Sequence, residues 1–194
     1  MSHHRRLGIA IFLLSFGVLL YELTLTRLFS VLMWYHFVSP IVSLALLGLT
    51  AGGLLVFLFP GRFPPSRAEE WLGRSSLLLS LSILVNWIFF FLLSRFPLLA
   101  YRVLSPFHQP FYEPFGPSAA GYVSWSTAFP LAIIFLVSVL PFFLGGFAAT
   151  LSICHFSRDI ARVYFYDLAG AGTGCLATFA LLTFLDPFSA LGFL

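Results

Sequence analysis

Three charged residues in apolar surroundings are the first candidates for chemistry in this chain. Glu22 and Arg27 follow the apolar run from Leu7 to Leu20, and Asp167 lies near the start of another apolar stretch. A charge inside a bilayer, or at its edge, costs a few kcal/mol or more unless it is paired or hydrated. These residues therefore indicate either a functional site or a structural lock between helices.

Glu22 and Arg27 are predicted to lie toward the outer side of one membrane helix. Counting from Arg6 at ~1.5 Å per residue places Glu22 roughly 24 Å along that helix, with Arg27 near the outer interface. A separation of five residues turns about 140° around a helix, so the two side chains do not share a face. Each side chain therefore needs a partner on another helix or on another molecule. Two interpretations fit this pattern: a site for a cationic or zwitterionic ligand, and a polar contact between helices. The polar residues expected on the same side are His36, Arg95, Arg102, His108, Glu113 and Asp186.

Asp167 is predicted to lie about one turn into the last span, on the inner side. An acid there is stabilised by the helix dipole, and Arg162 precedes it by five residues. The alternatives are a capped, paired helix start and a polar site. Because the predicted depths of Asp167 and Glu22 differ, the two carboxylates do not form one acid–base pair, and no catalytic residue is predicted.

The glycines after Asp167 resemble a nucleotide-binding loop but are predicted to pack helices. A nucleotide loop joins a strand to a helix, whereas this segment continues into a membrane span. Gly170 and Gly174 form a GxxxG pattern, as do Gly48 and Gly52, and this spacing lets helix backbones approach closely in lipid. No cofactor or metal site is predicted, and Cys154 and Cys175 are expected to be buried free thiols.

Composition requires a lipid environment for the elements that position these residues. The 194 residues are 60% hydrophobic and 9% charged, with a mean hydropathy of +1.00; soluble domains have roughly 25% charged residues. The arginines lie at the ends of apolar runs, which favours membrane topology over nucleic-acid binding. We predict one integral membrane domain over residues 1–194, an all-α bundle of transmembrane helices with a cytoplasmic N-terminus. Its five predicted spans cover about 7–32, 37–59, 75–94, 127–153 and 163–185.

Two further segments are predicted outside these spans. Residues 103–125 alternate prolines with aromatic residues, which predicts a periplasmic loop at the headgroup level. Its functional alternative is a docking surface for a partner. The apolar run from Phe188 to Leu194 is too short to span and predicts a partial sixth segment. Either it lies at the interface, or the chain is a piece of a longer protein.

Three blocks of sequence resemble one family of bacterial membrane proteins. These blocks are Tyr21-Glu22 with Thr26-Arg27-Leu28, the segment from Leu140 to Gly146, and the segment from Val163 to Gly174. In order and spacing they are similar to the membrane region of spermidine-synthase-like (aminopropyltransferase-like) proteins. The resemblance implies a membrane module that precedes a soluble domain of Rossmann type. Because the positions of that soluble domain are absent from this sequence, no catalytic residue is carried over.

Three functions are consistent with these observations. The first is a non-catalytic module or accessory subunit, docked within a larger complex in the bacterial inner membrane. Its expected partners are the lipid bilayer and other membrane subunits, with lipid or pigment at the aromatic surface. The second is binding or transport of a small polyamine-like cation through Glu22. The third is the membrane anchor of an aminopropyltransferase-like enzyme.

Overall fold

The computed structural model describes residues 2–33, 38–64, 67–95, 125–155 and 160–192, and every element within them is a helix. Five of these helices are long and apolar enough to cross a membrane, which confirms the predicted all-α membrane fold. The predicted loop over residues 103–125 lies almost entirely outside the described residues. The elements are α1 (Ser2–Met33), α2 (Val38–Leu58), η2 (Pro60–Arg62), α3 (Ala68–Arg95), α5 (Trp125–His155), α6 (Ile160–Phe184) and α7 (Pro187–Gly192).

Four helices begin earlier than the predicted spans, namely α1, α3, α5 and α6. Helix α3 starts at Ala68 rather than at residue 75, so part of the polar stretch between the second and third predicted spans is helical. Glu69 and Glu70 lie in its first turn, where the helix dipole favours them, and Arg74 forms an ion pair with Glu70 at 2.7 Å. Helix α6 starts at Ile160 rather than at residue 163.

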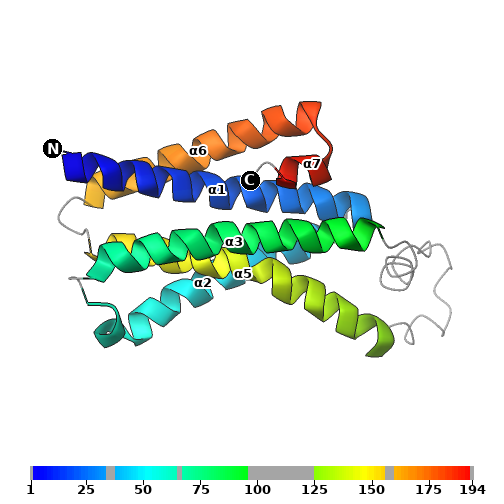
Figure 1. Cartoon of the computed structure of the whole chain (residues 1–194), viewed down its shortest axis with the longest axis horizontal. Coiled ribbons are helices and arrows are strands. Elements are labelled where there is room, and N and C mark those ends of the chain that lie inside the picture. Colours follow the sequence, from blue (N-terminus) through cyan, green and yellow to red (C-terminus); the bar gives the residue numbers. More distant parts are fainter. Residues whose placement is uncertain (1, 34–37, 65–66, 96–124, 156–159, 193–194) are drawn as a thin grey trace.

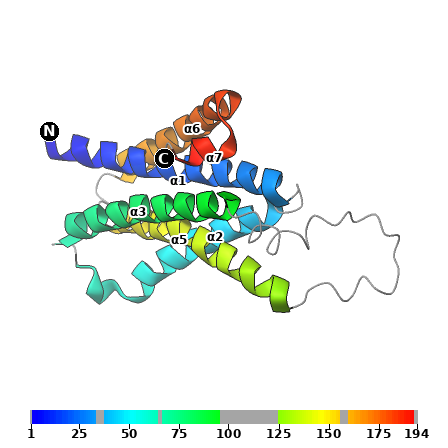
Figure 2. The same cartoon turned by 45° about the vertical axis from the view of Figure 1, so that its right-hand side comes forward.

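The helices run alternately up and down, with α1 between two groups (Figure 1). Helix α6 packs mainly on one side of α1, whereas α2 and α3 each pack on α5 on its other side (Figure 1). Figure 2 shows α2 and α5 crossing at an angle below α3. Helix α1 is therefore the only one of the five long helices that packs substantially on both groups.

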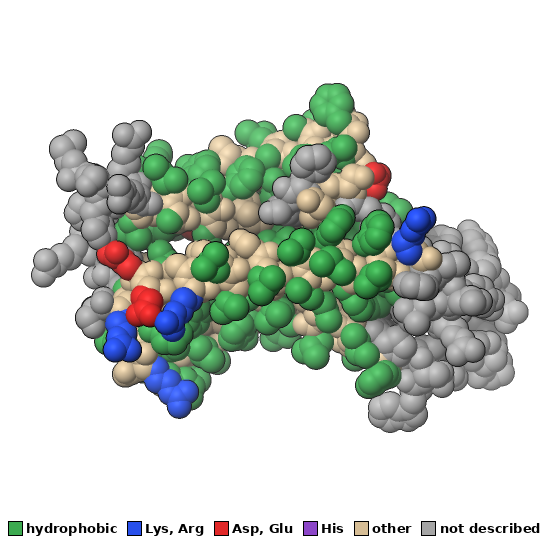
Figure 3. Space-filling model, in the orientation of Figure 1, with side chains coloured by type: hydrophobic (Ala, Val, Ile, Leu, Met, Phe, Trp, Pro, Cys, Tyr) green, Lys and Arg blue, Asp and Glu red, His purple; other side chains and the backbone are tan. Residues whose placement is uncertain are grey.

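The surface has the charge distribution of a membrane protein. Charged side chains gather at the two ends of the bundle, and apolar side chains cover the length between them (Figure 3). Among the described side chains, Arg62, Arg67, Arg74 and Arg162 belong to the end where α1 begins, and Arg27 and Arg95 to the other end. The end richer in arginine is the side predicted to be cytoplasmic.

Helices α2 and α5 approach each other through glycines. A Cβ atom on Gly48 would lie 2.6 Å from Cβ of Phe142, and one on Gly52 would lie 2.6 Å from the backbone nitrogen of Phe147. Gly146 on α5 meets the backbone of Leu49 in the same way. Since lipid provides no hydrophobic drive between helices, this close van der Waals contact holds the pair together.

Helix α5 also accepts hydrogen bonds from its neighbours in the turn before Pro141. Pro141 has no N–H, so the carbonyl of Val137 four residues earlier lacks a helical donor. Asn86 on α3 donates its side-chain N–H to that carbonyl at 2.8 Å. Tyr21 on α1 donates its hydroxyl to the next carbonyl, Ser138 O, at 3.3 Å. Neighbouring helices thus satisfy backbone groups that lipid could not.

The short helix α7 turns back into the bundle. Asp186 caps it, because its carboxylate accepts hydrogen bonds from the backbone N–H of Ser189 at 3.2 Å and from its hydroxyl at 2.6 Å. Ala190 and Leu191 are buried, and α7 contacts α1 and α3. The predicted partial sixth segment is therefore a packed helical turn over its described residues.

Candidate functional site

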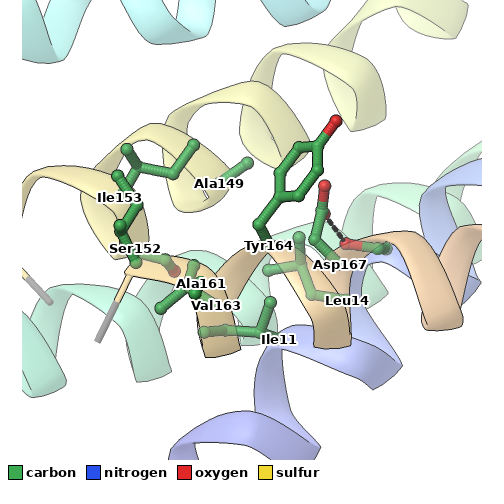
Figure 4. A pocket seen from close by; sticks show the side chains of 11 residues that line it. Ile11, Leu14, Ala149, Ser152, Ile153, Ala161, Val163, Tyr164 and Asp167 are labelled. Atoms are coloured by element: carbon green, nitrogen blue, oxygen red, sulfur yellow. Dashed lines mark hydrogen bonds between the residues drawn. The ribbon is translucent and has the colours of Figure 1, made fainter. Parts of the chain in front are cut away.

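A cavity of about 340 Å³ lies between α1, α5 and α6 and contains Asp167. It exists because α6 packs on α1 but hardly touches α5, which leaves a gap on the side of α6 that faces α5. Figure 4 shows Tyr164 and Asp167 projecting side by side from α6, with Ala149, Ser152 and Ile153 of α5 opposite them. The remaining lining residues are Ile11, Leu14, Ser15, Ile160, Ala161 and Val163.

Glycines set the register that brings Asp167 against α1. A Cβ atom on Gly174 would lie 2.8 Å from the carbonyl oxygen of Phe16, and Gly170 meets the backbone of Phe12. With the two backbones this close, Ser15 donates its hydroxyl to Oδ1 of Asp167 (dashed in Figure 4). The predicted GxxxG segment thus positions the carboxylate as well as packing the helix.

The electrostatics of this cavity are dominated by one carboxylate. Within the described residues, Oδ2 of Asp167 has no hydrogen-bond or ion-pair partner. The hydroxyl of Ser152 is engaged by its own helix, since it donates to Ala148 O at 2.9 Å. The walls are otherwise aliphatic, apart from the ring of Tyr164. The cavity therefore pairs one free carboxylate oxygen with an aromatic face and an apolar lining.

The prediction that Asp167 belongs to a capped, paired helix start is wrong. Because α6 begins at Ile160, Asp167 lies beyond the first turn, where the helix dipole no longer stabilises it appreciably. Arg162 is exposed and forms no ion pair with Asp167 in the described structure. The partner of Asp167 is instead Ser15, which is 152 positions away in the sequence.

A second, more open cavity of about 530 Å³ lies along α1 and α6 toward the other end of the bundle, and we call it the outer groove. Arg27 lines it and is exposed. Within the described residues, no acceptor contacts the Arg27 guanidinium. The other lining residues are Leu23, Thr26, Ser30, Cys175, Thr178, Phe179, Leu182 and Thr183.

Glu22 lines neither cavity. Its side chain is half-buried, and its backbone carbonyl accepts the hydroxyl of Thr26 at 2.8 Å. In the part of the chain that the structure describes, Glu22 forms no ion pair with Arg27 or with Arg95. The other predicted neighbours, namely His36, Arg102, His108 and Glu113, lie outside the described residues.

Sequence reasoning missed or misplaced several polar groups. Ser15 was counted as part of the apolar run from Leu7 to Leu20, and its polar side chain was not considered. The available signal was that it precedes Glu22 by seven residues and so lies on the same helical face. Asn86 was also missed, and its only signal was an amide inside an apolar run. Cys154 and Cys175 are exposed, which corrects the expected buried thiols. Both lie on outward faces of α5 and α6, where lipid is an adequate environment for a thiol.

No family model, curated protein or solved structure matches the chain.

Proposed function

We propose that this chain is a non-catalytic module of a larger complex in the bacterial inner membrane, docked through the outer groove. The observation that carries the proposal is a guanidinium inside a membrane-facing groove with no acceptor among the described residues. Near the outer interface of the membrane, such a group has strong donors available for a carboxylate or a free carbonyl of a partner. The resemblance to spermidine-synthase-like membrane regions supports the bacterial location.

The stripe of α6 beside the groove favours another helix as the occupant. Gly172 lies on the same helical face as Cys175, Phe179 and Thr183, and a Cβ atom added at Gly172 would meet nothing within 4 Å. Small residues on an uncovered face are typical of helix–helix contacts in membranes. The expected occupant is a transmembrane helix of another subunit that carries a carboxylate or free carbonyl level with Arg27.

The threonine hydroxyls of the groove are already used as donors within their own helices. Thr26, Thr178 and Thr183 each donate to a carbonyl of their own helix at 2.8 Å. They therefore present methyl groups and acceptor lone pairs, while Arg27 provides the strong donors. A partner helix is expected to pack on these threonines and to satisfy the guanidinium.

A photo-crosslinking amino acid at Phe179 tests this proposal in the native membrane. The matched control is Phe129, which is similarly exposed (69% against 78%) and also lies near the outer end of its helix. We expect Phe179 to give one discrete protein adduct that Arg27→Gln removes, and Phe129 to give lipid adducts. Lipid adducts alone at Phe179, or adducts insensitive to Arg27→Gln, would contradict the proposal.

A further inference from the structure

We propose that the cavity around Asp167 is a binding site for a primary ammonium group attached to an apolar chain. This inference does not depend on the docking proposal, because its residues lie toward the opposite end of α1 and α6. It also differs from the cation site predicted at Glu22, which lines neither cavity.

The depth of Asp167 is the first argument. At ~1.5 Å per residue, α6 is about 37 Å long and Asp167 lies roughly 10 Å from its start. A hydrocarbon core of about 30 Å centred on α6 therefore contains Asp167. A carboxylate at this depth needs a cation or a proton, and the described residues provide only the hydroxyl of Ser15.

The chemistry of the lining is the second argument. Ser15 engages Oδ1 of Asp167, which leaves Oδ2 available to accept from an N–H donor. Tyr164 projects beside the carboxylate (Figure 4), and an aromatic face attracts an ammonium group. Since the rest of the wall is aliphatic apart from Ser152, the ligand also needs an apolar body. A small metal ion finds only one carboxylate here and too few oxygen ligands.

Access to the cavity is the third argument. Tyr164, Ile153 and Ile160 line the cavity and are also exposed on the surface of the bundle. The opening therefore lies between α5 and α6 and faces the bilayer. A free alkylamine dissolved in the bilayer reaches it by this route. The ammonium group of phosphatidylethanolamine reaches it too, but there an anionic phosphate, not an apolar chain, follows the two carbons next to the nitrogen.

Binding of radiolabelled n-octylammonium to the whole chain in phosphatidylcholine nanodiscs tests the site, with binding to empty nanodiscs subtracted. We expect one saturable site that n-octanol does not compete for. Asp167→Asn should weaken binding at least about 30-fold, because it removes the charge while still accepting from Ser15. Tyr164→Leu should weaken it about 3-fold.

Glu22→Gln is the matched control, because it neutralises the other intramembrane carboxylate outside the cavity. Its octylammonium affinity should stay within about twofold of wild type, as expected for a residue that does not contact the ligand. Unchanged binding by folded Asp167→Asn, or equal competition by octanol, would overturn the proposal. If Asp167→Asn does not fold, Ala149→Phe tests the same cavity by filling it, and unchanged binding by that variant would also overturn the proposal.

Nanodiscs that contain phosphatidylethanolamine test whether the site requires an apolar chain next to the ammonium group. If the lipid headgroup occupies the site, octylammonium affinity falls in these nanodiscs, and native mass spectrometry shows a retained phosphatidylethanolamine that Asp167→Asn loses. If the affinity is unchanged, the headgroup does not compete for the site. The first result would overturn the requirement for an apolar chain next to the ammonium group, and the second supports it.

Discussion

The α2–α5 and α1–α6 pairs use the same glycine contact but have different surroundings. In both pairs, glycines on one helix meet the backbone of the other. Helix α5 is also covered by α3 and α1, and 44% of its span is buried, whereas only 17% of the α6 span is buried. The α2–α5 pair is thus part of a core, and the α1–α6 pair forms an edge with a cavity toward each end.

This difference indicates where binding is possible in so apolar a protein. In the core, the side chains of Asn86 and Tyr21 donate to carbonyls in the turn before Pro141. The core also holds buried polar atoms without a partner, such as Oδ1 of Asn86. At the edge, by contrast, Asp167 and Arg27 place charged groups with unused hydrogen-bonding capacity next to open cavities. A packing contact becomes a candidate site only where the third helix that would cover it is missing.

The largest expected effect is on the core. Gly146→Leu should destabilise the bundle by about 3 kcal/mol or more, because a Cβ atom there would lie 2.7 Å from the carbonyl carbon of Leu49. Unfolding in a titration with sodium dodecyl sulfate measures the loss. Gly172→Leu is the control, since nothing lies near its Cβ position, and its midpoint should not fall below that of wild type because leucine has the higher helix propensity. Equal loss in both variants would show that the loss does not come from contact with Leu49.

An intermediate effect is expected at the edge. Gly170→Leu should weaken the α1–α6 contact by about 2 kcal/mol, because the added side chain meets the backbone of Phe12. Since α6 packs mainly on α1, faster hydrogen exchange should be confined to α6 and the facing part of α1. Equally accelerated exchange in α2 and α5 would show that edge and core unfold together, which contradicts the comparison.

The smallest expected effect is at the proline. Asn86→Leu should cost about 1 kcal/mol, because the carbonyl of Val137 loses its donor. Pro141→Ala restores a helical N–H for that carbonyl, so the cost of Asn86→Leu should largely disappear in a Pro141→Ala background. A double-mutant cycle measured in the same detergent titration gives this coupling. Additive effects would mean that Asn86 stabilises α5 without compensating for Pro141.

Local properties of the chain determined its fold class. Apolar length predicted five membrane helices, because a span must be long and apolar whatever its neighbours are. Boundaries were less accurate: the start of α3 extends through polar residues that hydropathy assigns to a loop, although acids in its first turn favour a helix. The small size of Gly48, Gly52, Gly170 and Gly174 was equally readable from the sequence, but not which helix each one would meet.

Only the tertiary structure decided the chemistry. Ser15 meets Asp167, and Asn86 meets the carbonyl of Val137, across separations of 152 and 51 residues. No local pattern encodes such pairs, because they depend on which helices are neighbours and in what register. The cavity around Asp167 also depends on helix packing, because α6 packs on α1 and makes few contacts with α5. The sequence alone identified Asp167 as a carboxylate that is costly to place in lipid. Helix packing determined which residues surround it.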